Sequence, residues 1–572
     1  MREGRLTVRI LFLCSSHNSL SQRAHVELAA RGHEIAIELA LTPQLMIEAV
    51  EMFRPQLILA PFLKQVVPKD IWTHIKTLIV HPGIVGDRGP SSIDWAILHG
   101  ESEWGVTVLE AVEEMDAGPI WSARTFPMRD GTKSSLYKNE VVDAAAEAIL
   151  EAVERVASGK FKPYPLDYSR PSVRGRLRPP CKLADREFAW TDASEDILRK
   201  IRSADGSPGA LTTLCGQEVF IYGAHVDDLA RGAPGALVAQ RDGGVCVATG
   251  DGGIWVTHAR RRGADHLRLP ATTVLREHVA AVPVQPLDVM HPPPGRTWRE
   301  IWYEERAGVG HLHFDFYNGA MSTEQCHRLQ AAICQARKRP TKVLVLWGGR
   351  DYFSNGIHLY TIEAAKDPAW ESWENIQAIN DVCREIITAT DKVVVCALQG
   401  NAGAGGVMMA LGADRVWARR GVVLNPHYKG MGGLFGSEYW TWALPRRVGR
   451  DKAKELTDGL LPLGTAEAVR IGLLDDAFGE HVRDFKAEVL MRTEELARSA
   501  DQHEILKTKN HHLSRQEEMK PLAEFRREEL KEMLRCFMGT DSAYHTARTR
   551  FVRKAPAEHT PKHLATHRAR RR

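Results

Sequence analysis

The chain has 572 residues, of which 44% are hydrophobic and 26% charged, and its formal net charge is +4. This composition is typical of folded globular proteins, and the length predicts three or four domains. The small net charge does not by itself indicate a nucleic-acid partner. The nine cysteines include no Cys-x-x-Cys pair, which argues against a disulfide framework or a structural zinc site.

The apolar stretches are all too short to span a membrane. The first of them, Val8 to Cys14, is followed directly by polar residues, which favours a buried strand over a signal peptide. We therefore expect a cytoplasmic protein that binds neither membrane nor nucleic acid. The basic end of the chain, 567–572, is expected to be a frayed, solvated tail.

The first region alternates apolar strand patterns with helix patterns. The expected strands are Val8–Leu13, Ile35–Leu39, Leu57–Ala60 and Thr77–Val80, and the expected helices are Gln22–Arg31 and Gln44–Phe53. This alternation predicts βαβ units around a parallel sheet. Ligands of such sheets bind outside the carboxyl ends of the strands, and His81 directly follows a strand end.

A proline- and arginine-rich segment, 162–180, is typical of a linker. The following region, 181–285, begins with a short amphipathic helix and continues with short strand patterns separated by glycine. The helix is expected at Ala193–Ile201 and the strands at Gln217–Tyr222, Gly244–Thr249 and Gly253–His258. Such spacing predicts a small barrel. A second linker, 290–295, follows.

The alternation of strands and helices resumes near residue 308 and gives way to almost continuous helix after 480. The expected strands are Gly310–Phe316, Lys342–Trp347 and Lys392–Ala397, and the expected helices are Glu324–Arg337 and Trp370–Ile387. His311, His313 and Asp315 alternate along one strand and so share a face. We interpret this face as a polar strand edge and predict no metal site.

Three segments of the first region carry its chemistry: 81–90 (His-Pro-Gly-Ile-Val-Gly-Asp-Arg-Gly-Pro), 105–108 (Gly-Val-Thr-Val) and 115–118 (Met-Asp-Ala-Gly). In this order they resemble the formyltransferase family that uses 10-formyltetrahydrofolate. The resemblance implies that His81 and Asp116 are the catalytic pair.

Formyl transfer passes through a tetrahedral intermediate, whose oxyanion a histidine beside a carboxylate can stabilise. The carboxylate can move a proton between nucleophile and leaving nitrogen. The family also uses an asparagine where this chain has Ile79, so one oxyanion donor is missing. A loop-capping histidine and a turn aspartate remain the alternative interpretation. Residues 181–285 resemble the family's C-terminal domain. Arg88 and Ser207 are expected to contact the cofactor.

Two glycine-containing loops follow strands in the C-terminal half, at 350–359 and 399–408. They resemble the crotonase (enoyl-CoA hydratase/isomerase) family, in which each loop presents one backbone N–H to a thioester oxygen. The matching positions are Ile357 and Gly405. Met408 stands where a hydratase would have its first acid, which argues against ordinary hydration.

We predict Tyr428 and Glu438 as the proton-handling pair, with His427 as a lesser candidate. The alternative is that Tyr428 forms a wall and Glu438 caps a helix. Asn318 lies where crotonases hold coenzyme A, and Lys554 could bind its phosphates or lie on a solvated charged face.

The order of the modules resembles the hydrogenase maturation factor family HypX, also called HoxX. The resemblance implies an α/β multidomain protein: a Rossmann-like formyltransferase domain, a small β-barrel domain, a crotonase-like domain and a helical extension, at 1–165, 181–285, 308–480 and 481–572. It also implies production of carbon monoxide for the iron of a nickel–iron hydrogenase. Formyl would pass from 10-formyltetrahydrofolate to coenzyme A, and formyl-CoA would lose CO.

Two other functions remain open. The first half could formylate a small amine while the crotonase half serves as a CoA-binding or docking module. The missing asparagine at Ile79 argues against that reading. The chain could also be a scaffold without catalysis that delivers a one-carbon ligand to hydrogenase maturation proteins.

Overall fold

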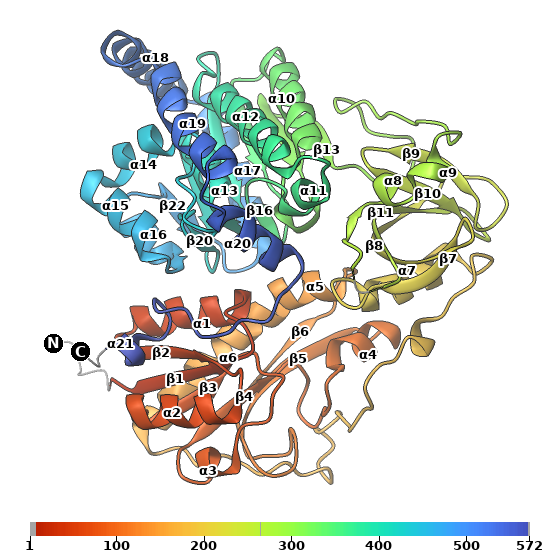
Figure 1. The fold of residues 1–572 in the computed structure, drawn as a ribbon, viewed down its shortest axis with the longest axis vertical. Helices are drawn as coiled ribbons and strands as arrows, with labels where there is room; N and C mark the ends of the chain where they lie inside the picture. The colour runs from red at the N-terminus through yellow and green to blue at the C-terminus, as the bar shows by residue number, and fades with distance from the viewer. Residues whose placement is uncertain (1–6, 264, 570–572) are drawn as a thin grey trace. The chain divides into compact units, whose positions relative to one another are not determined.

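The computed structural model describes residues 7–263 and 265–569 and divides into two compact units (Figure 1). The first unit holds the described residues up to Thr212, together with Phe220–Tyr222 and the described residues from Pro556 to Ala569. The second unit holds Thr213–Val219 and Gly223–Ala555.

A six-stranded sheet forms the core of the first unit. Its strands, in spatial order, are β2 (Glu34–Leu39), β1 (Arg9–Cys14), β3 (Leu57–Ala60), β4 (Thr77–His81), β5 (Glu103–Glu110) and β6 (Ile120–Pro127). The first four strands are parallel, as the alternation predicted. The last two run antiparallel to their neighbours, so the sheet is mixed.

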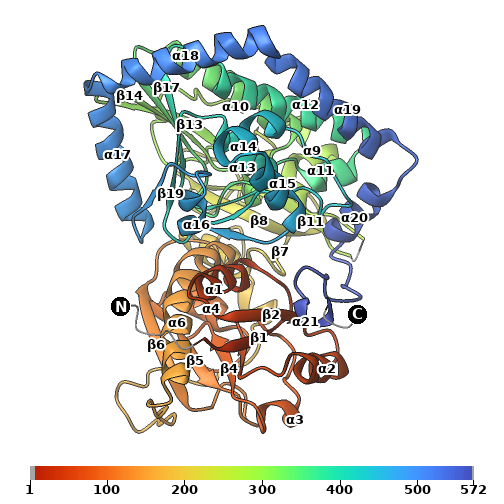
Figure 2. The same ribbon diagram turned by 90° about the vertical axis from the view of Figure 1, so that its left-hand side faces the viewer.

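Helices cover both faces of this sheet (Figures 1 and 2). On one face lie α1 (Ser19–Ala30) and α6 (Val142–Ser158); on the other lie α2 (Pro43–Phe53) and α3 (Lys69–Trp72). The short elements α4 (Ser92–Leu98), α5 (Lys133–Leu136), η1 (Tyr137–Val141), η2 (Ala184–Arg186) and α7 (Ser194–Ala204) complete the unit. Both faces of β3, and of β1 from Ile10 onward, are buried, which explains why these residues are all apolar.

The C-terminal segment corrects one expectation from the sequence. Glu38 of β2 is buried, and its carboxylate accepts hydrogen bonds from Thr560 Oγ1 (2.6 Å) and Arg568 Nε (3.0 Å) and contacts His567 Nε2 (2.7 Å). The Ile37 N–H donates to the Leu564 carbonyl at 3.1 Å. The tail is therefore docked as far as α21 (Thr566–Ala569), because a buried carboxylate needs partners.

A second six-stranded sheet corresponds to the small β domain. Its strands are β7 (Ala210–Leu214), β8 (Gln217–Asp227), β11 (Gly253–Arg261), β10 (Gly244–Ala248) and β9 (Leu237–Arg241) in spatial order, with β12 (Leu269–Pro270) paired to β11. Helices α8 (Ala271–Val274) and α9 (Arg276–Val279) follow. Trp255 and Trp298 pack at its centre.

The C-terminal α/β domain of the second unit is built on two further sheets. The larger has the order β13 (Ile301–Arg306), β14 (Val309–Phe314), β15 (Val343–Trp347), β17 (Val393–Leu398), β19 (Arg415–Arg419) and β22 (Asp476–Phe478). The smaller has the order β16 (Tyr352–Ser354), β18 (Asn401–Gly403), β20 (Val423–Asn425) and β21 (Leu463–Gly464). Figure 1 shows helices on both faces of the larger sheet.

The remaining helices belong to this domain. They are η3 (Tyr317–Gly319), α10 (Thr323–Arg337), α11 (Leu359–Ala364), α12 (Pro368–Ile387), α13 (Gly405–Leu411), α14 (Trp440–Val448), α15 (Arg450–Gly459), α16 (Thr465–Arg470), α17 (Val482–Arg498), α18 (Asp501–Met519), α19 (Leu522–Met538) and α20 (Ala543–Val552). The predicted α/β multidomain fold is confirmed. Among the described residues, no helix combines the length and apolar character needed to cross a membrane.

Candidate functional site

His81 and Asp116 lie together at the carboxyl end of β4. His81 is the last residue of the strand, and its ring is almost fully buried. Its Nδ1 lies 3.5 Å from Asp116 Oδ2, and its Nε2 lies 2.9 Å from Asp87 Oδ2. One imidazole thus stands between two carboxylates, an arrangement suited to holding and passing a proton.

Hydrogen bonds and an ion pair hold the loop that carries Asp116. Asp116 has a left-handed φ of 55°, and its Oδ2 accepts a hydrogen bond from the Gly89 N–H at 3.1 Å. Arg88 holds the same loop, since its Nε donates to the Met115 carbonyl at 2.9 Å and its guanidinium pairs with Glu114 at 2.7 Å. Arg88 is therefore engaged by the protein at this loop.

Asp87 is a site residue that sequence reasoning missed, although it lies only six positions after His81. Its side chain is fully buried, and its Oδ1 lies 3.7 Å from Arg178 Nε. The Gly83 backbone lies close to this carboxylate, since a Cβ on Gly83 would lie 2.4 Å from Asp87 Oδ2. Ile79, two positions before His81 on β4, places an aliphatic side chain where the family has an amide.

In the C-terminal α/β domain, the two glycine loops meet. A Cβ on Gly356 would lie 3.3 Å from Gly405 N, so the loop that carries Ile357 touches the start of α13. Ala404, just before that helix, has a left-handed φ of 46°. Met408 is buried in the core and lies outside any acid–base role.

Tyr428 and Glu438 form a buried hydrogen-bonded pair beside these loops. The Tyr428 hydroxyl donates to Glu438 Oε2 at 2.8 Å, and the other carboxylate oxygen points at Gly405, where an added Cβ would lie 2.2 Å from it. Burial raises the pKa of Glu438 to about 7, while the hydrogen bond from Tyr428 acts in the opposite direction. A carboxyl group with such a pKa can take up and release a proton near neutral pH.

A polar network behind this pair was also missed from the sequence. The Glu438 N–H donates to Asn380 Oδ1 at 2.7 Å, and Asn380 Nδ2 donates to Ser437 Oγ at 2.8 Å. Asn380 comes from α12, about sixty positions earlier in the chain, so no local pattern could reveal this contact.

The other candidates lie apart from these pairs or at their edges. Asn318 has a left-handed φ of 58°, and its carbonyl accepts from Asn355 Nδ2 at 2.9 Å. The Ser207 carbonyl accepts from Lys133 Nζ at 2.7 Å, and a cis peptide follows Ser207. Lys554 is exposed just after α20, and His427 is half-buried beside Tyr428.

The strand with alternating histidines presents an aromatic face. His313 is stacked between Trp302 and Trp347, with ring centroids 4.7 and 5.8 Å away, and Trp347 Nε1 donates to His311 Nδ1 at 3.2 Å. Burial lowers the pKa of His311 to about 4 and that of His313 to about 3. Within residues 7–263 and 265–569, no group of three His, Cys, Asp or Glu side chains is arranged to hold a metal.

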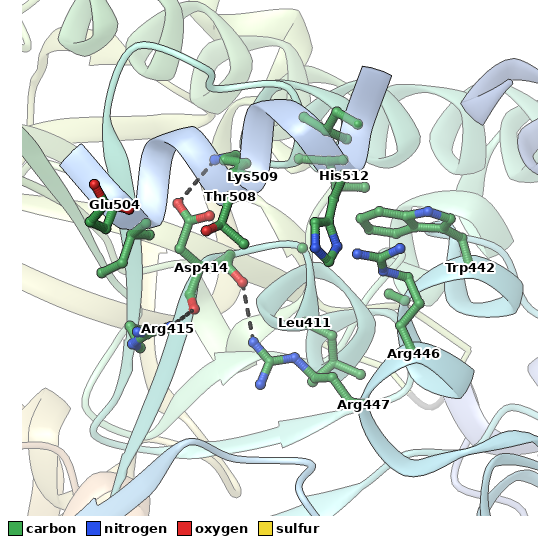
Figure 3. A pocket seen from close by; sticks show the side chains of 16 residues that line it. Leu411, Asp414, Arg415, Trp442, Arg446, Arg447, Glu504, Thr508, Lys509 and His512 are labelled. Carbon is green, nitrogen blue, oxygen red and sulfur yellow. Dashed lines mark hydrogen bonds and ion pairs between the residues drawn. The ribbon is translucent and has the colours of Figure 1, made fainter. Parts of the chain in front are cut away.

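A hollow of about 450 Å³ opens near α14 and α18 (Figure 3). There Lys509 pairs with Asp414 at 3.0 Å, and Arg447 reaches the Ala413 carbonyl at 3.2 Å. Tyr428 and Glu438 do not line it, so it is separate from the acid–base pair.

Three family profiles match successive parts of the chain. Residues 1–153 match formyl transferase, 181–273 match the formyl transferase C-terminal domain, and 304–561 match enoyl-CoA hydratase/isomerase. Fold and profile matches thus define a formyltransferase-type domain joined to a crotonase-type domain.

One relative spans almost the whole chain. The hydrogenase maturation factor HoxX of Bradyrhizobium diazoefficiens is 47% identical over 566 residues, which cover 99% of this chain and 98% of that protein. The crystal structure of HypX from Aquifex aeolicus in complex with tetrahydrofolic acid is 46% identical, with a TM-score of 0.95 over 98% of this chain and 99% of that one. A methionyl-tRNA formyltransferase of Roseiflexus castenholzii is 34% identical over 179 residues, 30% of this chain and 55% of that protein. The chain belongs to the hydrogenase maturation factor family HypX/HoxX.

Proposed function

We propose that this protein makes carbon monoxide for the iron of a nickel–iron hydrogenase, in two steps, from the formyl group of 10-formyltetrahydrofolate. The observation that carries the proposal is the buried Tyr428–Glu438 pair, whose second carboxylate oxygen faces Gly405 in a chain that also has a formyl transferase domain. Hydrogenase maturation proteins are the partners that would receive the product.

In the first step, the thiol of coenzyme A attacks the formyl carbon. The C–S bond forms, the bond to N10 of the folate breaks, and the thiol proton ends on that nitrogen. His81 donates a hydrogen bond to the oxyanion of the tetrahedral intermediate, and Asp116 carries the proton. Asp87 orients the imidazole through Nε2, at 2.9 Å. Arg88 and Ser207 are proposed to contact the folate or coenzyme A.

In the second step, formyl-CoA loses CO. Formyl-CoA has no α-carbon, so the usual crotonase enolate cannot form. Glu438 instead takes the formyl proton, the C–S bond breaks with its electron pair going to sulfur, and the proton is returned to the thiolate. The products are CO and coenzyme A, with no net oxidation. The backbone N–H groups of Ile357 and Gly405 would polarise the formyl oxygen, and Asn318 and Lys554 would hold the coenzyme A moiety.

The experiment supplies purified protein with 10-formyltetrahydrofolate and coenzyme A and traps CO with reduced haemoglobin. Two variants separate the steps. His81→Ala should stop CO formation from the folate but still release CO from added formyl-CoA. Glu438→Gln should form formyl-CoA and accumulate it.

The alternatives give different outcomes in the same assay. Formylation of an added amine without CO would favour the amine formyltransferase. Absence of any turnover in the unmodified protein would favour the scaffold. Unchanged CO release by Glu438→Gln would refute the role given to that carboxylate.

A further inference from the structure

We propose that Glu529, on α19, is a positioning residue that holds the turn carrying Glu438 and so fixes the carboxylate that receives the formyl proton. This inference rests on the proposed decarbonylation. Glu529 does not touch the reacting atoms; it acts through the backbone of residues 437–441.

Glu529 is completely buried, and both of its oxygens are used. Oε2 accepts from the Tyr439 N–H at 2.9 Å and from Ser437 Oγ at 3.3 Å. Oε1 accepts from the Thr441 N–H at 2.8 Å and from Thr441 Oγ1 at 2.5 Å. Four donors within five consecutive residues therefore converge on one carboxylate.

The turn that Glu529 holds has an unfavourable backbone. Glu438 and Tyr439 have φ values of 62° and 58°, two consecutive left-handed residues with side chains. Such a conformation persists only where the surroundings enforce it. Asn380 holds the N–H of Glu438 from one side, and Glu529 holds the N–H of Tyr439 from the other.

The same contacts complete the start of α14. Tyr439 is the N-cap of this helix, and its side chain makes no capping hydrogen bond. The first N–H groups of a helix need acceptors, and a negative charge at this end is favourable. Glu529 supplies both, although it lies 88 positions after Thr441 in the chain.

The helix that carries Glu529 is itself anchored. Arg526 pairs with Asp381 of α12 at 2.6 Å, and Met533, on the same face of α19 as Glu529, accepts from the Gly436 N–H at 3.2 Å. Glu529 is thus fixed in place on a packed element, which is what a positioning residue requires.

The test uses the full chain and measures two reactions separately: CO release from added formyl-CoA, and formation of formyl-CoA from the folate. Glu529→Gln replaces one acceptor oxygen with an amide N–H₂ that would face N–H donors. We expect kcat for CO release to fall about 100-fold, with KM changed by less than about twofold, and formyl transfer unchanged. Glu528→Gln is the matched control, because Glu528 is an exposed neighbour on α19 that pairs with Lys520 at the surface.

The outcomes separate this inference from the proposed function. If the unmodified protein releases no CO from formyl-CoA, the proposed function fails. If it does and folded Glu529→Gln matches it in kcat, the positioning role is wrong. Equal loss of both reactions would mean general damage to the fold and would also overturn it. If Glu529→Gln does not fold, Thr441→Val is tested in its place, because it removes one hydroxyl donor to Glu529. We expect kcat for CO release to fall several-fold in Thr441→Val, and an unchanged kcat would overturn the proposal.

Discussion

A single methyl group placed at Gly405 should disable CO release without unfolding the protein. An alanine Cβ there would lie 2.2 Å from Glu438 Oε1 and 2.6 Å from its Cδ. The backbone of Gly405 begins α13 and is not left-handed, so alanine fits the local conformation. The strain therefore falls on the end of the Glu438 side chain, which must retreat by roughly 1 Å.

A displacement of that size in a reacting group costs about 100-fold in rate. We expect Gly405→Ala to lower kcat for CO release from formyl-CoA by about this factor, while formyl transfer from the folate continues. The assay is CO capture by reduced haemoglobin, with thermal unfolding measured on the same samples. Gly430→Ala is the matched control, because its Cβ would meet nothing within 4 Å. A folded Gly405→Ala protein that releases CO at the original rate would refute the placement of Glu438 as the base.

Three further predictions concern other contacts. Hydrogen bonds and charge partners lower the pKa of buried Glu38 against the opposing effect of burial, so the ionised carboxylate stabilises the fold fully above the pKa of the unfolded carboxyl and this stabilisation is lost as pH falls through the lower folded pKa. The urea midpoint of the first unit should therefore fall between pH 5 and 3, and it should fall by less in His567→Ala. Asp87→Asn removes an acidic partner of the His81 imidazole and should slow formyl transfer about 10- to 100-fold in a single-turnover assay, with CO release from formyl-CoA intact. Gly436→Ala would place a Cβ 2.2 Å from the Tyr428 ring at a left-handed φ of 92°, and should lower both thermal stability and CO release.

Strands β1, β3, β4, β15 and β17 could be predicted because each holds a continuous apolar run. The prediction for Leu57–Ala60 matches β3 residue for residue. By contrast, β13 (Ile301–Arg306) was missed, since it is an edge strand of mixed polarity that pairs antiparallel with β14. Its identity depends on its neighbour rather than on its own pattern.

Some residues of the candidate sites could also be predicted from the sequence, and others could not. His81 and Asp116 were predicted from a family motif, whereas Tyr428 and Glu438 were chosen from the acid–base residues of a loop that departs from the crotonase pattern. The structure places the four residues in two close pairs. The groups that hold them could not be found, because the contacts are set by tertiary packing. Glu529, for example, lies in a charged helical stretch directly after the exposed Glu528, and the sequence does not distinguish the two.

The docked C-terminal segment shows a limit of composition as a guide. A basic stretch is usually solvated, and residues 567–572 carry that pattern. The C-terminal segment docks because of Glu38, a buried carboxylate on β2. Burial of such a charge is costly unless cations and hydrogen-bond donors reach it. The buried acid in one segment therefore predicts a partner elsewhere, and the basic tail supplies it.

The two proposed catalytic acids share an unusual backbone conformation. Asp116 and Glu438 both have left-handed backbones, with φ values of 55° and 62°, and neither is glycine. Such residues cost about 1–3 kcal/mol each, so the fold must hold them there. In each case the carboxylate or the N–H next to it is tied to another segment: Asp116 accepts from Gly89 N, and Glu438 N donates to Asn380. At these strained positions the carboxylates lie 3.5 Å from the His81 ring and 2.8 Å from the Tyr428 hydroxyl, so the same contacts that hold the backbone also hold each acid beside its partner.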